Sequence, residues 1–263
     1  MARVSIVIPC YNDGQYLDES VGSALAQTYG DIQVIIVNDG STDSATLDKL
    51  GSFTDPKITV LHKENGHLSS ARNHGIQYAS GEYILTLDAD DWFEPSFVQK
   101  AVDILDNQKM VGGVTCYLKA FGLKRFSWKP LGGNLKNFLF RQESCASAMF
   151  RRERWEALGG YDEQMRSGYE DWEFWIRLTS SGFTVQVIKE YLFHYRITSK
   201  SMLLTESEPN REAIVGYIMD KHRDTYWSEL KDAVIQRKII DLRNPESTRI
   251  LLKNLYWRLT NKR

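Results

Sequence analysis

Hydrophobic runs alternate with amphipathic segments through the first third of the chain. Residues 4–8, 32–37 and 83–87 are rich in β-branched and aliphatic side chains, which is typical of strands buried on both faces of a sheet. Apolar residues recur at helical spacing over residues 15–29. The other elements expected here are a strand at 58–61 and helices at 46–50 and 69–79. This alternation predicts an α/β fold with a doubly wound, mostly parallel sheet, because right-handed crossovers place helices on both faces.

The regular alternation ends in the second half of the chain. The elements expected there are helices at 96–107, 152–158 and 171–180 and strands at 111–118, 145–150, 185–188 and 192–197. Residues 121–134 are rich in glycine, lysine and aromatic side chains, which predicts a long loop of the kind that forms lids. From residue 199 onward the pattern is mixed and mostly helical.

The composition is that of an ordinary globular protein. Of the 263 residues, 42% are hydrophobic and 25% are charged, so the chain has neither the low hydrophobicity nor the charge excess of a disordered protein. The formal net charge is −1 and the pI is about 6.5. Such a chain has no global basic field to attract nucleic acid, and we expect no nucleic-acid partner.

Cysteine usage and hydropathy predict a cytoplasmic protein. Cys10, Cys116 and Cys145 are odd in number and far apart, unlike a disulfide framework or a zinc site. The first apolar run has only five residues before Pro9, which is too short for a signal peptide. No run approaches the roughly 18 apolar residues of a membrane span.

Polar clusters follow three of the expected strands. They occupy residues 11–13, 38–43 and 88–91, each directly after a hydrophobic run. In open α/β sheets, ligands bind beyond the carboxyl ends of the strands. We therefore expect the three clusters to meet at one edge of the sheet and to form a binding site.

Two of these clusters carry candidate chemistry. Asp88 and Asp90 place two carboxylates after a buried strand, and Mg²⁺ or Mn²⁺ often takes one or two carboxylates together with substrate phosphates. The alternative is that acidic residues are simply common in turns. Asp39, before Gly40, also leaves two interpretations open. Its carboxylate could bind a ribose or a nucleobase, or it could cap its own backbone in an Asx-turn.

An acid after the second strand is also a mark of dinucleotide-dependent oxidoreductases. That function needs G-x-G-x-x-G in the first turn, where the backbone approaches a pyrophosphate. This chain has Pro9-Cys-Tyr-Asn-Asp-Gly14 there, which argues against an oxidoreductase. A diphosphate would then need other positive charge, which a metal on Asp88 and Asp90 together with Arg72 would supply. The alternative for Arg72 is a solvated helix arginine.

Four motifs, in order, resemble the signatures of family-2 glycosyltransferases of the GT-A fold. They are Val4-Ser-Ile-Val-Ile-Pro-Cys-Tyr-Asn12, Val37-Asn-Asp-Gly-Ser-Thr-Asp43, Ser70-Ala-Arg-Asn73 with Gly75, and Gly81-Glu-Tyr-Ile-Leu-Thr-Leu-Asp-Ala-Asp-Asp91. Several ordered motifs are far more specific than any one of them. The resemblance implies a Rossmann-like domain at 1–200, with a nucleotide-sugar-binding half at 1–91 and an acceptor half at 92–200. A mainly helical extension would occupy 201–263.

The resemblance also implies roles for residues of these motifs. The nucleotide pocket is expected to be lined by Pro9, Tyr11, Asn12 and, on the uracil side of the donor, Asp39. Arg72 is expected to face the diphosphate. The segment Asp88-Ala89-Asp90 would lie against the donor phosphates, with Mn²⁺ or Mg²⁺ held by Asp88 and Asp90.

Two adjacent carboxylates, Glu170 and Asp171, belong to the acceptor half. An inverting transfer needs a base that faces the acceptor hydroxyl from the side opposite the leaving group. The resemblance implies that Asp171 is this base and that Glu170 supports it. The alternative is helix capping, which would lower the pKa of such an acid. His194 resembles a residue that reaches the metal in some relatives, and a structural histidine is the alternative.

The last fifteen residues, 249–263, combine leucines on one helical face with basic residues elsewhere and contain no acid. Such a helix can lie on an anionic leaflet, or it can dock its apolar face on the domain. The first alternative predicts peripheral contact with the inner face of the membrane.

Together these features predict a metal-dependent inverting glycosyltransferase that moves a sugar from a nucleotide-sugar, expected to be UDP-linked, to a hydroxyl. The resemblance implies a saccharide or lipid-linked saccharide acceptor in surface polysaccharide or glycolipid synthesis. The alternatives are a non-catalytic nucleotide-sugar-binding protein and the dinucleotide-dependent oxidoreductase.

Overall fold

The computed structural model describes residues 3–235. The chain separates into two compact units, Met1–Gly216 and Tyr217–Arg263. Among the described residues, no helix is both long enough and apolar enough to cross a membrane. The helix expected at 249–263 lies outside the described residues and stays a prediction.

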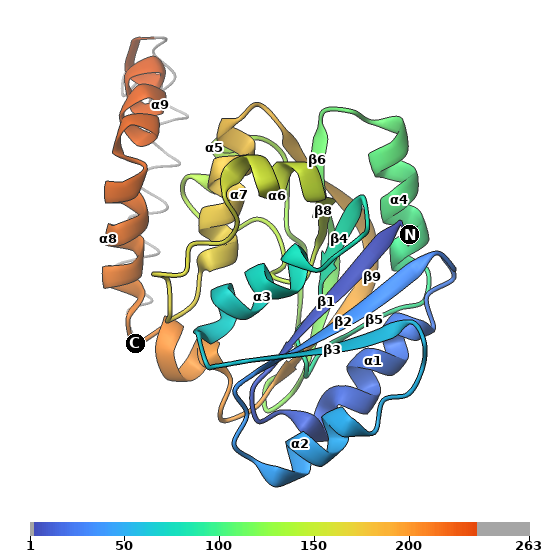
Figure 1. Ribbon diagram of the computed structural model, residues 1–263. Coiled ribbons are helices and arrows are strands. Elements are labelled where there is room, and N and C mark those ends of the chain that lie inside the picture. The colour runs from blue at the N-terminus through green and yellow to red at the C-terminus, as the bar shows by residue number, and fades with distance from the viewer. Residues whose placement is uncertain (1–2, 236–263) are drawn as a thin grey trace. The chain divides into compact units, whose positions relative to one another are not determined.

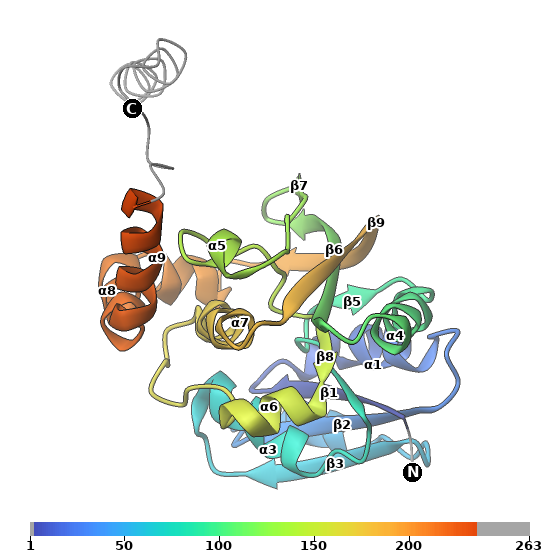
Figure 2. The same cartoon turned by 90° about the horizontal axis from the view of Figure 1, so that it is seen from above.

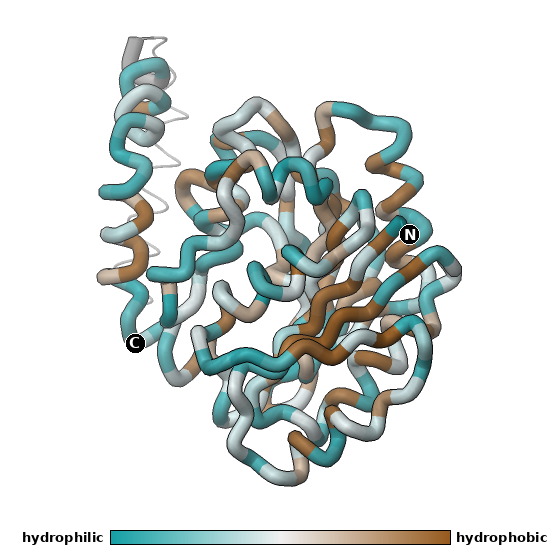
Figure 3. The backbone as a smooth tube through the Cα atoms, in the orientation of Figure 1, coloured by the Kyte–Doolittle hydropathy of each residue, from teal (hydrophilic) through white to brown (hydrophobic). Residues whose placement is uncertain are grey.

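Four parallel strands form the first half of one sheet. Their spatial order is β3 (Ile58–Lys63), β2 (Ile32–Asp39), β1 (Val4–Cys10) and β4 (Tyr83–Thr86) (Figure 1). β1 is buried along its whole length, and Figure 3 shows β1 and β2 as the most continuous hydrophobic segments of the sheet. The parallel first half matches the prediction from the hydrophobic runs.

Helices cover both faces of these strands. α1 (Leu17–Leu25) and α4 (Phe97–Asn107) belong to the same hydrophobic core as Ile6 and Ile8. α3 (His67–Gln77) packs against the opposite face of β1 and β2 (Figure 2), the face that Val7 occupies. The side chains of β1 divide in this way because successive residues of a strand point to opposite faces. α2 (Ser44–Gly51) follows β2 and packs beside the one-turn helix η1 (Gly14–Tyr16).

Gly75 lets α3 approach the sheet closely. A Cβ at this position would lie 2.5 Å from Val7 Cγ1 and 2.8 Å from Val37 Cγ2. Gly75→Ala is therefore expected to lower the free energy of unfolding by about 1–3 kcal/mol, because overpacking outweighs the better helix propensity of alanine. Gly22→Ala in α1 is the matched control, since a Cβ at Gly22 would have no neighbouring atom within 4 Å. We expect this change to stabilise the protein by up to about 1 kcal/mol. Urea unfolding measures both, and equal effects would contradict the packing argument.

The second half of the sheet is mixed. β8 (Met149–Arg151) runs antiparallel to both β4 and β6 (Val111–Gly122), which is parallel to β9 (Thr184–Ile197). The two remaining strands are antiparallel edge pieces, β5 (Trp92–Phe93) on β9 and β7 (Phe126–Trp128) on β6. Within the described residues this makes one nine-stranded sheet. The predicted fold class, a doubly wound and mostly parallel α/β sheet, is confirmed.

Three predictions for the second half were wrong in detail. Residues 121–134 are not one loop, because β6 continues to Gly122 and turns back as β7. The strands expected at 185–188 and 192–197 are one strand, β9, whose pairing with β6 shifts register near Tyr117. The strand expected at 145–150 begins only at Met149. Pairing with a neighbouring strand decided each boundary, and hydrophobic periodicity does not contain that information.

The remaining helices lie in the second half of the chain. In the first unit they are α5 (Leu135–Phe138), α6 (Arg152–Leu158), α7 (Glu170–Ser180) and the short π-helix η2 (Leu203–Ser207). α8 (Arg211–Lys221) spans the boundary between the units, and α9 (Arg223–Ile235) belongs to the second. The mostly helical character expected after residue 199 is confirmed for the described part of this region.

Candidate active site

The three polar clusters meet at one edge of the sheet. Cys10, the last residue of β1, pairs with Asn38 of β2. The backbone N–H of Leu87, after β4, donates to the carbonyl of Val7 over 3.0 Å. Residues 11–13, 38–43 and 88–91 therefore leave neighbouring strands on the same side, as their positions after the hydrophobic runs suggested.

Asn12 ties the first cluster to the second. Its Oδ1 accepts hydrogen bonds from the backbone N–H groups of Thr42 at 2.8 Å and Asp43 at 3.0 Å. Its own N–H donates to Ser41 Oγ over 3.0 Å. The residue adopts a left-handed φ of 57°, which asparagine tolerates better than most side chains. Asn12 thus fixes the shape of both loops.

The residues beside Asn12 differ in exposure. Pro9 is buried in β1 opposite Val37, so it shapes the strand end through its backbone. Tyr11 exposes 48% of its surface and offers a ring at the edge. The first strand end therefore presents an aromatic side chain above an ordered turn.

Asp39 is held by residues from other elements. Its Oδ1 accepts from Lys63 Nζ at 2.7 Å and from the backbone N–H of Gly66 at 3.0 Å. The two donors come from the end of β3 and from the residue before α3. The Asx-turn interpretation, in which Asp39 caps only its own backbone, is not the arrangement found. The carboxylate is instead fixed at the sheet edge.

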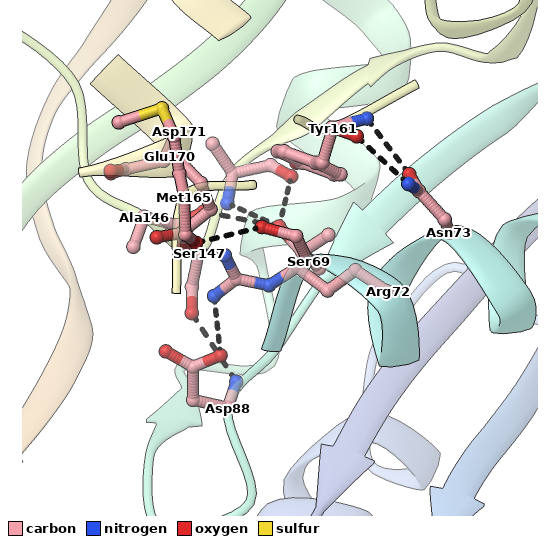
Figure 4. A network of polar contacts seen from close by, with 12 residues as sticks. Ser69, Arg72, Asn73, Asp88, Ala146, Ser147, Tyr161, Met165, Glu170 and Asp171 are labelled. Atoms are coloured by element: carbon pink, nitrogen blue, oxygen red, sulfur yellow. Dashed lines mark hydrogen bonds and ion pairs between the residues drawn. The ribbon is translucent and has the colours of Figure 1, made fainter. Parts of the chain in front are cut away.

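Arg72 joins the two halves of the site. Its guanidinium is fully buried, and Nη2 lies 2.6 Å from Asp88 Oδ1 while Nη1 contacts Glu170 Oε1 (Figure 4). Burial opposes its charge, but the two carboxylates outweigh burial and hold the pKa of Arg72 above its usual range. The solvated-helix interpretation of Arg72 is therefore wrong. The side chain connects the end of β4 with the start of α7.

The motif around Arg72 also anchors α3 to the segment between α6 and α7. Asn73 Nδ2 donates to the carbonyl of Tyr161 over 2.9 Å, and its Oδ1 accepts from the N–H of Tyr161 at 2.8 Å (Figure 4). Ser69 Oγ donates to the carbonyl of Met165 over 3.4 Å. The guanidinium of Arg72 lies 5.6 Å from the ring centre of Tyr161. These contacts determine where Arg72 can reach.

Glu170 and Asp171 begin α7 but have different partners. Glu170 pairs with Arg72, whereas Asp171 Oδ2 accepts a hydrogen bond from Gln142 Nε2. Burial raises the pKa of Asp171 to about 8, and the negative charge of Glu170 adds to the rise. The positive charge of Arg72 and the backbone N–H of Trp172 act in the opposite direction. A depressed pKa, as capping alone would give, is therefore not found.

Carboxylates gather at the end of β4. Burial raises the pKa of Asp90 to about 7, and the charges of Asp88 and Asp13 add to this. Asp91 is fully buried, and its Oδ2 has no hydrogen-bond partner among the described residues. Crowded carboxylates of this kind fit Mg²⁺ or Mn²⁺, which relieve the mutual repulsion and accept hard oxygen ligands. Ala89, between the two candidate ligands, is buried.

His194 lies with other partners. Its ring stacks on Trp92 with centres 3.5 Å apart, and Nε2 lies 3.0 Å from Glu94 Oε1. Within residues 3–235, no group of three histidine, cysteine or acidic side chains is arranged to hold a metal. The structure thus brings Asp88 and Asp90 together but places His194 in a structural contact beside β5.

A pocket of about 410 Å³ contains the centre of this site. It is lined by Arg72, Asp88, Asp91, Glu170 and Asp171, and also by Gln142, Tyr169, Trp172, Tyr195 and the aromatic pair Phe126 and Trp128. The nucleotide candidates Pro9, Tyr11, Asn12 and Asp39 do not line it and lie along the neighbouring strand ends. Gln142 and Tyr195 were missed because no motif marks them.

Comparison with known proteins agrees with this geometry. A family model described as glycosyl transferase family 2 matches residues 5–159, and one described as the N-terminal domain of galactosyltransferase matches residues 140–201. The glycosyltransferase GlyG of Streptococcus pneumoniae is 28% identical over 265 residues, covering 90% of this chain and 80% of that protein. The uncharacterized glycosyltransferase RC0461 of Rickettsia conorii is 45% identical over 103 residues, 39% of this chain, and the match spans only 17% of that longer protein.

Solved structures share the fold at low sequence identity. S. aureus TarS 1-349 in complex with UDP-GlcNAc has a TM-score of 0.66 at 17% identity, covering 77% of this chain and 61% of that one. The mannosyltransferase PcManGT from Pyrobaculum calidifontis, in complex with GDP-Man and Mn²⁺, has a TM-score of 0.59 at 20% identity, covering 76% and 59%. The family match decides against the oxidoreductase alternative. The chain belongs to family 2 of the glycosyltransferases and has the GT-A fold.

Proposed function

We propose that this chain transfers a sugar from a UDP-sugar to a hydroxyl acceptor with inversion, assisted by Mn²⁺ or Mg²⁺. The observation that carries the proposal is the contact of one buried guanidinium, Arg72, with Asp88 on one side and Glu170 on the other. Asp88, on the expected phosphate side of the donor, and Asp171, the expected base, line the same pocket. Inverting transfer needs these two groups close together on opposite sides of the anomeric carbon.

The donor would lie along the ends of β1, β2 and β4. Tyr11 and Asn12 would face the nucleotide with Pro9 beneath them, and Asp39 would contact the uracil. The ordered loop that Asn12 holds supports this role, because a preformed pocket costs less on binding. The similarity to a TarS structure solved with UDP-GlcNAc supports a UDP-linked donor.

Asp88 and Asp90 would hold the divalent cation, which supplies charge neutralisation for the departing diphosphate when it is bound. Arg72 would act from the other side through the field of its buried charge, since its two Nη donors already contact Asp88 and Glu170. Its position is preorganised, so little reorganisation is needed as the leaving group forms. His194, which contacts Trp92 and Glu94, is not included among the proposed metal ligands.

Asp171 would accept the proton of the acceptor hydroxyl. A base works best when its pKa lies near the working pH, and the raised pKa of Asp171 meets this condition. Gln142 orients the carboxylate. Glu170 is paired with Arg72, so Asp171 would be the carboxylate of the two that is available to accept a proton. The negative charge of Glu170 would also raise the basicity of Asp171.

The acceptor side is proposed in coarser terms. A saccharide or lipid-linked saccharide of a surface polysaccharide or glycolipid would enter beside Tyr169 and Trp172, both of which line the pocket. In this proposal the chain consists of a transferase domain at 1–200, with donor and acceptor halves, and a C-terminal extension at 201–263. Peripheral membrane contact through residues 249–263 remains part of the proposal, as does a cytoplasmic site of action.

The proposal is tested by thermal unfolding with a panel of nucleotide-sugars, each with and without Mn²⁺. A ligand at 100 times its Kd stabilises by about 2.7 kcal/mol, which corresponds to about 5–11 °C in a unit of this size. We expect this shift with one UDP-sugar in the presence of Mn²⁺. A shift without any hydrolysis or transfer would favour the non-catalytic alternative. No shift with any nucleotide-sugar would contradict the proposed function.

A further inference from the structure

A strongly basic segment borders the pocket. Residues 119–141, here called the basic segment, contain no acidic residue and six basic ones: Lys119, Lys124, Arg125, Lys129, Lys136 and Arg141. All six are exposed. Because the chain as a whole carries a net charge of −1, this positive charge is a local feature and not a consequence of composition.

The basic segment also exposes large apolar side chains. Leu123 and Leu131 each expose 63% of their surface, Phe126 exposes 48% and Phe140 exposes 82%. The other large apolar side chains exposed in the described part of the first unit, Tyr11, Leu47, Tyr78 and Met110, are spread over the rest of its sequence. Scattered exposed apolar residues are normal, but a group of them marks an interaction surface.

The fold places part of this segment in the wall of the pocket. β7 pairs with the end of β6, so Leu123, Lys124 and Arg125 form the tip of a hairpin. Figure 2 shows β7 and α5 along the border of the first unit that lies opposite β3. Phe126 and Trp128 line the pocket. The basic segment therefore includes both an exposed hairpin tip and part of the pocket wall.

We propose that the basic segment docks on the surface of an anionic lipid bilayer. Leucine and phenylalanine side chains would enter the interface, and the lysines and arginines would contact the lipid headgroups. An anionic polymer in solution would account for the charge but would leave the four apolar side chains in water. A purely apolar partner would bury them but would offer no anionic group to the exposed lysines and arginines, of which Arg141 already pairs with Glu143. The bilayer surface matches both features.

Docking has a consequence for the pocket. Because Phe126 and Trp128 belong both to the basic segment and to the pocket wall, a docked chain would hold the pocket against the membrane, where a lipid-linked acceptor resides. This consequence rests on the proposed function. The lipid binding itself does not depend on the proposed function. Vesicle binding and sugar transfer are therefore measured separately, and either can fail without the other.

The first test is co-sedimentation of the full chain with phosphatidylcholine vesicles that contain phosphatidylglycerol. One variant combines Leu123→Ser, Lys124→Gln, Arg125→Gln and Phe140→Ser. We expect it to bind these vesicles at least about tenfold more weakly than the wild type. The matched control combines Leu47→Ser, Tyr78→Ser, Lys109→Gln and Lys189→Gln, which are exposed positions elsewhere with the same change in charge. It should bind as the wild type does. Residues 249–263 are identical in both variants, so their contribution cancels.

The second test places a reporter on the hairpin tip. All three native cysteines are buried, so a thiol from Leu123→Cys will react selectively with an environment-sensitive fluorophore. Anionic vesicles should shift its emission to the blue, while the same label at Leu47→Cys should not respond. An unchanged emission at position 123, or equal binding by both combined variants, would overturn the proposal. Binding to dextran sulfate without binding to vesicles would overturn it in favour of an anionic polymer.

Discussion

Asp171→Asn is expected to lower the turnover number by roughly 10²- to 10⁴-fold while the affinity for the UDP-sugar stays nearly unchanged. The size is that of a lost general base. The affinity should hold because the side chain of Asp171 is hydrogen-bonded to Gln142 and not to a donor candidate in the described part of the chain. Asparagine keeps the volume and can still accept the hydrogen bond from Gln142, so the fold should be preserved. Steady-state transfer assays and calorimetric titration with UDP and Mn²⁺ measure the two quantities.

The pH dependence gives a sharper form of this prediction. Asp171 can accept a proton only when it is ionised, and its pKa is raised to about 8, chiefly by burial. The rate of transfer should therefore rise as the pH increases through about 8. Asp171→Asn should remove this rise, here called the rising limb of the pH profile. Glu170→Gln is the informative companion, because the charge of Glu170 helps to raise the pKa of Asp171. Removing that charge should move the limb to lower pH.

Other outcomes would reassign the base. If Asp171→Asn kept near-normal turnover, the base would have to be another group, and Glu170 would be the next candidate. If Glu170→Gln left the pH of the limb unchanged while Asp171→Asn abolished the limb, Asp171 would remain the base. The inference that the charge of Glu170 raises the pKa of Asp171 would then be wrong. A limb that persists in both variants would assign the titration to a group outside α7.

Asp88→Ala and Asp90→Ala are each expected to abolish the dependence of UDP binding on Mn²⁺. In the wild type, the Kd for UDP should fall when Mn²⁺ is added, because the cation bridges the carboxylates and the diphosphate. In the variants, the ratio of the two Kd values should approach about 1. Asp88→Ala should also disturb Arg72, since it removes one of its two carboxylate partners. Calorimetric titrations with and without Mn²⁺ decide this.

His194→Ala serves as the control for the metal prediction. Because His194 contacts Trp92 and Glu94, the variant should keep the full effect of Mn²⁺ on UDP binding. A loss of that effect would show that His194 moves to the cation when the donor is bound, contrary to its place in the structure. Undiminished Mn²⁺ dependence in both aspartate variants would contradict the assignment of the metal to the end of β4.

The sequence alone determined the features that depend on local pattern. Hydrophobic runs at residues 4–8 and 32–37 identified the buried parallel strands, because a strand covered on both faces needs apolar side chains at successive positions. The turn residues after these runs predicted which edge of the sheet carries the candidate site, because all parallel strands end on the same side. The four motifs, in their order along the chain, also carried the resemblance to family-2 glycosyltransferases, which the family match confirmed.

The tertiary structure decided which distant residues meet. Arg72 contacts Glu170, 98 positions further along the chain, and Glu94 contacts His194, 100 positions away. The same holds for Gln142 with Asp171 and for the continuous strand β9, whose register against β6 shifts at bulges. Periodicity reports only how a segment divides its side chains between core and solvent. Contacts between segments depend on strand register and on the exact packing of the helices, which many distant residues determine together.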